Sequence, residues 1–194
     1  MTPALILASR SPQRRAILEQ AGVPFTVRPA GVDELETGPP EEVALENAYR
    51  KAARIAADAG PADGPVLGVD TVVSLGSQIY GQPTDPADAA RILGALSGRP
   101  HRVISGLCVI EGGRVQTAAA RTVVRFAPLD AARIDWYVAR GEWRGRAGGY
   151  AIQGAGAVLV EAIDGDYLNV VGLPLRTLLE LRPGLLGDRS GDRG

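Results

Sequence analysis

The chain contains very little cysteine, histidine and lysine: each of these residue types occurs once, as Cys108, His101 and Lys51. A single cysteine excludes a disulfide within the chain and a metal site built from several thiolates. No apolar run is long enough to span a membrane, and the charges near the N-terminus follow a short apolar stretch, the reverse of a signal peptide. We therefore expect a cytoplasmic protein with no membrane partner.

An excess of charge of one sign is also absent. The formal net charge is −1 at pH 7, which excludes bulk attraction to nucleic acid or acidic membranes. A polyanion would therefore have to bind at a local cluster of cations. The 194 residues are 45% hydrophobic, which supports a proper core. We expect one domain of two lobes over residues 1–182 and a frayed tail over residues 183–194, where Gly, Arg and Asp dominate.

A short apolar run with one carboxylate, residues 66–73, predicts a strand buried on both faces. Strand alternation puts the even-numbered residues of this run on one face and the odd-numbered residues on the other. An ionised Asp70 at its centre is costly unless a cation, a metal ion or a substrate group compensates it. Gly68 is expected to leave open space on the same face. Asp70 is therefore either a functional carboxylate or a residue near a strand end that caps a neighbouring loop.

The first predicted strand, residues 4–8, leads directly into a helix. Ser11 suits the N-cap of this helix and Gly22 suits its C-terminal end. Arg14 and Arg15 lie in the first turn, where the helix dipole disfavours cations. A strand that leads into a helix whose start carries free amides, hydroxyls and arginines is typical of an anion site. The alternative is a pair of solvated arginines.

Lys51 lies in a second predicted helix, residues 41–59, whose apolar residues recur at helical spacing. Arginine supplies the positive charge everywhere else in the chain. The one lysine therefore either meets a need for a compact ammonium group or occurs by chance on a solvated helix face.

The rest of the chain predicts alternating strands and helices. His101 precedes a strand, and we expect it to be a hydrogen-bonded structural residue rather than a catalyst. The glycine-rich stretch 141–156 suits a close approach of the backbone to a ligand. Further strands are expected at 25–27, 79–80, 103–110, 114–126, 158–163 and 167–171, helices at 84–95, 128–140 and 173–181, a hairpin turn at 111–113 and an acidic loop at 33–36.

Several short sequence motifs occur in a fixed order along the chain. Each motif is a weak signal alone, but together they indicate one protein family. They are Ser9-Arg10-Ser11-Pro12-Gln13-Arg14, Asp33-Glu34, Lys51-Ala52, Asp70-Thr71-Val72-Val73, Ser97-Gly98 with His101, Val103 and Gly106, Ala147-Gly148-Gly149-Tyr150-Ala151-Ile152-Gln153-Gly154 and Val170-Val171-Gly172-Leu173-Pro174-Leu175. With these blocks, the chain resembles the Maf-type nucleoside triphosphate pyrophosphatases over residues 5–181.

The resemblance implies a fold and an activity. The implied fold is α/β, similar to inosine triphosphatases, with a long, bent, mixed sheet and two lobes around a positive central cleft. The implied reaction is cleavage between the α- and β-phosphates to give a nucleoside monophosphate and pyrophosphate, with a divalent metal cation, Mg²⁺ or Mn²⁺. Members clear non-standard or excess nucleotides, are typically cytoplasmic and are often homodimers.

The resemblance also implies roles for particular residues. Asp70 would be the general base, and Glu34 and Asp70 would hold the metal ion. The substrate-binding set would be Ser9, Ser11, Gln13, Arg14, Lys51, Thr71, Gln82 and Gln153. Within that set, Arg14 and Lys51 would bind the triphosphate, while Thr71 and Gln153 would read the base and place the chain with the subfamily that prefers dTTP and UTP.

Two departures from the family pattern each remove one cation near the expected phosphates. Gln13 replaces an arginine at a position tied to substrate specificity, and Gln82 replaces a common lysine. One alternative function is therefore a pyrophosphatase for 7-methyl-GTP or other modified nucleotides. Another is a non-catalytic nucleotide-binding regulator of septum formation, which would not need Asp70 or Glu34.

Overall fold

Seven strands form one mixed sheet in the computed structural model of the chain, which describes residues 5–60 and 63–186. The sheet order is β2-β1-β3-β5-β6-β7, and β4 pairs with the end of β3. Strand β1 is parallel to β2 and β3, and the other pairs are antiparallel. The strands are β1 (Leu5–Leu7), β2 (Phe25–Val27), β3 (Val66–Leu75), β4 (Gln78–Tyr80), β5 (Pro100–Glu111), β6 (Arg114–Phe126) and β7 (Val160–Asp164).

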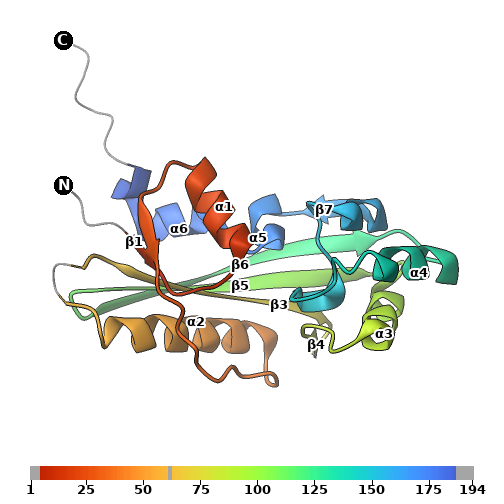
Figure 1. Cartoon of the computed structure of the whole chain (residues 1–194), viewed down its shortest axis with the longest axis horizontal. Helices are drawn as coiled ribbons and strands as arrows, with labels where there is room; N and C mark the ends of the chain where they lie inside the picture. The colour runs from red at the N-terminus through yellow and green to blue at the C-terminus, as the bar shows by residue number, and fades with distance from the viewer. Residues whose placement is uncertain (1–4, 61–62, 187–194) are drawn as a thin grey trace, which may run out of the picture.

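Helices cover both faces of this sheet (Figure 1). Helix α2 lies along one face, α1, α5 and α6 lie on the other, and α3 and α4 lie at the far end near β4. Across residues 5–60 and 63–186, no helix combines the length and apolar character needed to cross a bilayer. The helices are α1 (Pro12–Gln20), α2 (Pro40–Ala56), α3 (Pro86–Leu96), α4 (Ala131–Ala139), α5 (Tyr167–Val171) and α6 (Leu175–Leu181), with 3₁₀ helices at Ala147–Gly149, Ala155–Leu159 and Pro183–Leu186.

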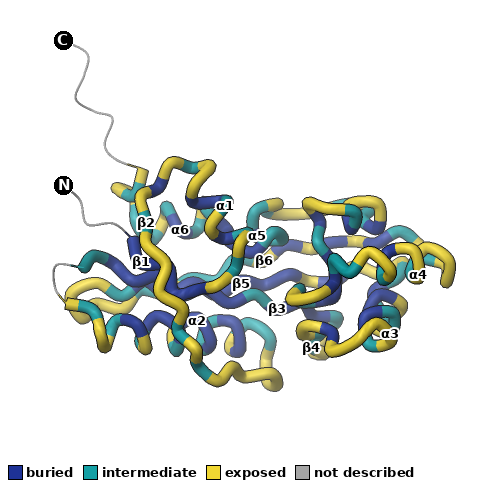
Figure 2. The backbone as a smooth tube through the Cα atoms, viewed as in Figure 1, coloured by how far each residue is buried: buried dark blue, intermediate teal, exposed yellow. Residues whose placement is uncertain are grey.

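Strands β3 and β5 form the buried centre of the molecule (Figure 2). The alternation predicted for β3 is confirmed: Leu67 and Val69 pack with the α1 and α6 side, whereas Val66 packs with Ala48 and Ala52 of α2. Both faces of the strand are therefore buried, and the expected α/β fold built on one mixed sheet is confirmed.

Local signals predicted the first helix and the long hairpin correctly. The Oγ atom of Ser11 accepts a hydrogen bond from the backbone N of Arg14 at 3.4 Å, and Gly22 ends the helix with φ +68°. Gly112 and Gly113 both have positive φ and form the two-residue turn between β5 and β6. Such a turn needs residues that tolerate positive φ, which is why glycine marks it in the sequence.

Residues 167–171 form helix α5, so the predicted strand there is wrong. Asp166 caps the helix through a 2.8 Å hydrogen bond from Leu168 N to Oδ1, and Gly172 ends it with φ +128°. The buried Asn169 donates hydrogen bonds to oxygens of β5 and β6. A short apolar run fits a strand or a buried helix equally well by periodicity, and these tertiary contacts decide for the helix.

Several element ends differ from the prediction by a few residues. Helix α2 ends at Ala56 rather than residue 59, because Ile55 is its last residue buried against the sheet. Strand β7 begins at Val160, two residues later than predicted, because a 3₁₀ helix precedes it. Of the predicted tail, residues 183–186 form a 3₁₀ helix and residues 187–194 lie outside the described residues, as do residues 1–4.

Helix α2 approaches the sheet closely because two strand positions beneath it are glycine. A Cβ atom on Gly68 would lie 2.0 Å from the carbonyl oxygen of Ala48, and one on Gly106 would lie 2.3 Å from that of Ala44. The prediction that Gly68 leaves open space beside Asp70 is therefore wrong: the backbone of α2 fills that space. The two glycines set how near the side chains of α2 come to β3.

One edge of β3 has a gap between its two neighbours. Strand β1 pairs with β3 up to Leu67, and β4 pairs with it from Val73 onward. Within the described residues, no strand pairs with residues 68–72 on this edge, while β5 pairs with residues 66–74 on the opposite edge. Side chains from both faces of the sheet therefore reach one opening, Asp70 from the α2 face and Thr71 from the α1 face.

Candidate active site

A cavity of about 1010 Å³ lies at this gap and is lined by residues from the start of α1, from α2 and β3, and from the segments that follow β2 and β4. All ten residues to which the resemblance assigns a role line it. They are Ser9, Ser11, Gln13, Arg14, Glu34, Lys51, Asp70, Thr71, Gln82 and Gln153. A cavity of this size is large enough for a nucleotide.

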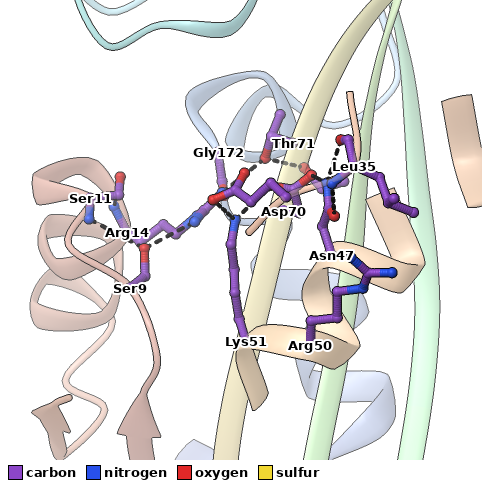
Figure 3. A network of polar contacts seen from close by, with 12 residues as sticks. Ser9, Ser11, Arg14, Leu35, Asn47, Arg50, Lys51, Asp70, Thr71 and Gly172 are labelled. Atoms are coloured by element: carbon purple, nitrogen blue, oxygen red, sulfur yellow. Dashed lines mark hydrogen bonds and ion pairs between the residues drawn. The ribbon is translucent and has the colours of Figure 1, made fainter. Parts of the chain in front are cut away.

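Lys51 reaches from α2 to two carboxylates (Figure 3). Its Nζ atom lies 2.7 Å from Oδ1 of Asp70 and 2.9 Å from Oε1 of Glu34. Lys51 is 9% exposed and Asp70 is 6% exposed, so this ion pair is largely shielded from solvent. Lys51 therefore does not lie on a solvated helix face. A compact ammonium group fits between two carboxylates, where the planar fork of arginine would demand more room.

Asn47, one helical turn before Lys51, binds Asp70 and the acidic loop at once. Its Nδ2 atom donates to Oδ2 of Asp70 at 3.1 Å and to the carbonyl oxygen of Leu35 at 3.0 Å, while its Oδ1 accepts from Leu35 N at 2.7 Å. The loop that carries Glu34 is thereby held against Asp70. No sequence motif indicated Asn47, although its position four residues before Lys51 places both side chains on one helix face.

Arg14 is buried and bonded to three oxygens of the protein. Its Nε donates to the Gly172 carbonyl at 2.9 Å, Nη1 donates to Ser9 Oγ at 2.9 Å, and Nη2 donates to Thr71 Oγ1 at 3.2 Å. Burial lowers the pKa of the Arg14 guanidinium, and the negative charges of Asp70 and, to a smaller extent, Glu34 oppose that shift. The guanidinium of Arg14 stays charged beside the cavity, because arginine is not deprotonated in proteins. Arg15, in contrast, is exposed to solvent.

Thr71 is fixed from two sides. Its Oγ1 accepts from Arg14 and lies 2.9 Å from the Oγ of Ser105, which is fully buried on β5. Ser105 was not predicted as a site residue. It pairs with Thr71 only through the register of β3 and β5, which nothing in the local sequence reveals.

One wall of the cavity consists of two segments, the loop after β4 and the glycine-rich stretch. Gln82 follows β4, and Gln153 lies in the glycine-rich stretch; both are exposed. The backbone N of Gly148 donates to the Gly81 carbonyl at 3.0 Å and joins the two loops. The glycine-rich stretch also brings Arg146, a further cation, to this wall.

A divalent cation fits the carboxylates of this site. Oxygens of Glu34 and Asp70 both lie within 2.9 Å of the Lys51 nitrogen, so one cation can contact both groups. Among the described residues, no cluster of three or more His, Cys, Asp or Glu side chains forms a metal site. Mg²⁺ is commonly held by one or two carboxylates together with substrate phosphates and water, so this pair suits it only in the presence of a phosphate ligand.

His101 lies outside the cavity lining and is buried beside Phe126 and Tyr150. Its Nε2 lies 2.9 Å from the hydroxyl of Tyr150, and its ring packs edge-on against Phe126. Burial lowers the pKa of His101 to about 4, so the ring is neutral at pH 7. This environment is the structural one that its sequence position predicted.

The fold and the site together define an α/β protein that can hold a polyanion next to a buried, cation-paired carboxylate. Residues 4–182 match the Maf-like protein family. The chain belongs to this family, as its short blocks predicted.

Curated relatives match nearly the whole chain. A dTTP/UTP pyrophosphatase of Gloeobacter violaceus is 48% identical over 93% of this chain and 95% of its own length. A dTTP/UTP pyrophosphatase of Alcanivorax borkumensis is 47% identical, and one of Pyrococcus furiosus is 42% identical. Each of these two matches covers 91% of this chain and 93% of the relative. Among solved structures, a HAM1 protein from Coxiella burnetii has a TM-score of 0.45 at 18% identity, over 66% of this chain and 75% of its own.

Proposed function

We propose that this protein is a nucleoside triphosphate pyrophosphatase that hydrolyses dTTP and UTP to the monophosphate and pyrophosphate. One observation carries the proposal: a buried carboxylate, Asp70, opens onto a nucleotide-sized cavity while Lys51 and Asn47 hold both its oxygens. The shared name of the three relatives supports the choice of substrate. The non-catalytic alternative gives no reason for a buried carboxylate, Asp70, in the lining of the cavity with Glu34 beside it.

Asp70 is the proposed general base. It takes a proton from a water molecule as the water oxygen bonds to the α-phosphorus. The bond from that phosphorus to the bridging oxygen breaks, and pyrophosphate leaves with the electron pair. Lys51 and Asn47 leave Asp70 few rotational alternatives, which supports its role as a positioned base.

Positive groups offset the charge of the triphosphate in this proposal. Arg14 and Lys51 each keep N–H donors beyond those used in the protein and can direct them to phosphate oxygens. Glu34 and Asp70 would hold a divalent cation, Mg²⁺ or Mn²⁺, which neutralises charge on the phosphates when bound. Ser9, Ser11 and Gln82 line the same space and would add neutral hydrogen bonds.

The proposed base reading uses Thr71, Gln153 and Gln13. Uracil and thymine present both donors and acceptors, and a side-chain amide offers the same combination. Oε1 of Gln13 already accepts a hydrogen bond from Ser11 Oγ at 3.1 Å. The NH₂ group of Gln13 is therefore the part of the amide that can donate to a base. A base with the wrong pattern would leave such groups unpaired at about 1–3 kcal/mol each.

Cytoplasmic location and a homodimer complete the proposal. Cys108 is buried in the core, and burial raises the pKa of its thiol to about 11, so the chain's one cysteine offers no reactive thiol for a disulfide. Sedimentation equilibrium of the purified chain would decide between a monomer and a homodimer.

A nucleotide panel with pyrophosphate detection tests the proposal. The panel contains dTTP, UTP, CTP, GTP and 7-methyl-GTP, each with Mg²⁺, with Mn²⁺ and with EDTA. We expect pyrophosphate release that is fastest for dTTP and UTP and is abolished by EDTA. Preference for 7-methyl-GTP would overturn the substrate assignment, and binding of nucleotides without any release of pyrophosphate would favour the regulator.

A further inference from the structure

We infer that Arg146 binds the β- and γ-phosphates, the part of the substrate that leaves as pyrophosphate. This inference rests on the proposed function and adds a residue to which no role has been assigned. Arg146 comes from the glycine-rich stretch and lines the same cavity as Arg14 and Lys51.

The cations and carboxylates that line the cavity nearly balance one another. Four cations line the cavity, Arg10, Arg14, Lys51 and Arg146, and three carboxylates, Glu34, Glu36 and Asp70, offset most of their charge. The ammonium of Lys51 already contacts two of these carboxylates, and the guanidinium of Arg14 already contacts three protein oxygens. A triphosphate carries several negative charges, so cations without such partners have most to gain from binding it.

The side chain of Arg146 lacks partners in the part of the chain that the structure describes. Its Nε is buried and has no hydrogen-bond partner there. No described carboxylate oxygen lies within 4.0 Å of its side-chain nitrogens, including that of the nearby Glu142. A buried donor without an acceptor is costly, and a ligand that supplies the acceptor removes this cost.

Backbone hydrogen bonds of the glycine-rich stretch hold Arg146 in place. Its N donates to the Trp143 carbonyl at 3.2 Å, and its own carbonyl accepts from Gly149 N at 3.0 Å. Gly148 is bonded to the loop that carries Gln82, so the wall around Arg146 is joined at several points. The amides of this wall, Gln82 and Gln153, are neutral and supply no charge to offset a phosphate. Arg146 supplies the positive charge of this wall, and its guanidinium can donate two parallel hydrogen bonds to a pair of phosphate oxygens.

Calorimetric titration separates the two halves of the substrate. The ligands are inorganic pyrophosphate and UMP, each with Mg²⁺, against the wild type, Arg146→Ala and Arg146→Lys. We expect the Kd for pyrophosphate to rise about 10- to 100-fold in Arg146→Ala, as for loss of hydrogen bonds to a charged group. The Kd for UMP should stay within about twofold, and Arg146→Lys, which keeps a charge without the fork, should fall between.

Arg144→Ala is the matched control. Arg144 lies two residues earlier in the same loop, is exposed, stacks on Trp143 at 4.5 Å and does not line the cavity. Its loss should leave both affinities unchanged, and thermal melting should show that all variants are folded.

Two results would overturn the inference. An unchanged affinity for pyrophosphate in a folded Arg146→Ala variant would show that the phosphates bind elsewhere. A loss for UMP that matches the loss for pyrophosphate would move Arg146 to the nucleoside half. A wild type that binds pyrophosphate but releases none from dTTP would instead refute the proposed function and leave the assignment of Arg146 standing.

Discussion

The Nζ atom of Lys51 lies 2.7 Å from Oδ1 of Asp70, although the two residues come from a helix and a strand and are 19 positions apart. The only lysine of the chain thus pairs with the only carboxylate of the central strand. Because both groups are buried, removal of one would leave the other charged and uncompensated. Substitution of either residue is therefore expected to affect both catalysis and the stability of the fold.

Asp70→Asn should abolish most turnover and leave nucleotide binding largely intact. The amide cannot accept a proton from water, and loss of a general base typically costs about 10²- to 10⁴-fold in rate. Steady-state kcat for dTTP and the Kd of a non-hydrolysable dTTP analogue measure the two effects. Asp135→Asn, an exposed change on α4, is the control. A kcat near that of the wild type would remove Asp70 from the mechanism.

Lys51→Met should weaken binding of UTP by about tenfold or more and change binding of uridine by less than twofold. The substitution removes the charge that faces the phosphates and leaves two carboxylates close together. Arg54→Met serves as the control, because Arg54 is an exposed cation on the same helix. Equal losses for UTP and uridine would place the phosphates away from Lys51. Arg14→Ala should follow the same pattern in the same titrations.

Gly68→Ala and Gly106→Ala should each destabilise the fold and lower turnover, because a methyl group would collide with the backbone of α2. Overpacking of this kind costs typically 1–3 kcal/mol. Gly94→Ala is the opposite control: it lies within α3, where the new Cβ has 4.0 Å to its nearest neighbour, and it should stabilise by about 0.5–1 kcal/mol. Urea unfolding measures all three. A neutral Gly68→Ala would show that α2 moves away at little cost.

The free energy of unfolding should fall as the pH drops from about 6.5 to about 4. His101 is neutral in the fold because burial lowers its pKa to about 4, whereas the unfolded chain binds the proton at the ordinary pKa of 6.5. In that window the unfolded state holds more protons, so each pH unit costs up to about 1.4 kcal/mol. His101→Gln removes this group and should give a shallower slope between pH 4 and 6.5 in urea unfolding. Parallel curves for the two proteins would exclude His101 as the cause.

Gln13→Arg should sharpen the preference for dTTP and UTP over the purine triphosphates. An arginine offers more donors in a fixed geometry than the amide of Gln13, whose oxygen is occupied by Ser11. The ratio of kcat/KM between dTTP and GTP, measured in both proteins, is the readout. Should the ratio stay the same, position 13 does not select the base.

Part of the fold was predictable because its signals are local. Ser11 and Gly22 specify the ends of α1, and Gly112 and Gly113 specify the hairpin turn, since caps and positive φ act on neighbouring residues only. The period of two in the strand around Asp70 placed its even-numbered residues on one face correctly. The family blocks likewise placed ten residues around one cavity, because their order along the chain is visible in the sequence.

Only the tertiary structure decided the contacts within the site. The sequence by itself indicated that Asp70 needs a compensating group, but it left open whether Lys51 was that group, and it did not indicate Asn47 or Ser105. It also suggested an empty space at Gly68, where the backbone of α2 lies. Which side chain meets Asp70 depends on how closely a helix packs on a sheet and on the register between β3 and β5. Those distances arise from packing among residues far apart in the chain, and no local pattern encodes them.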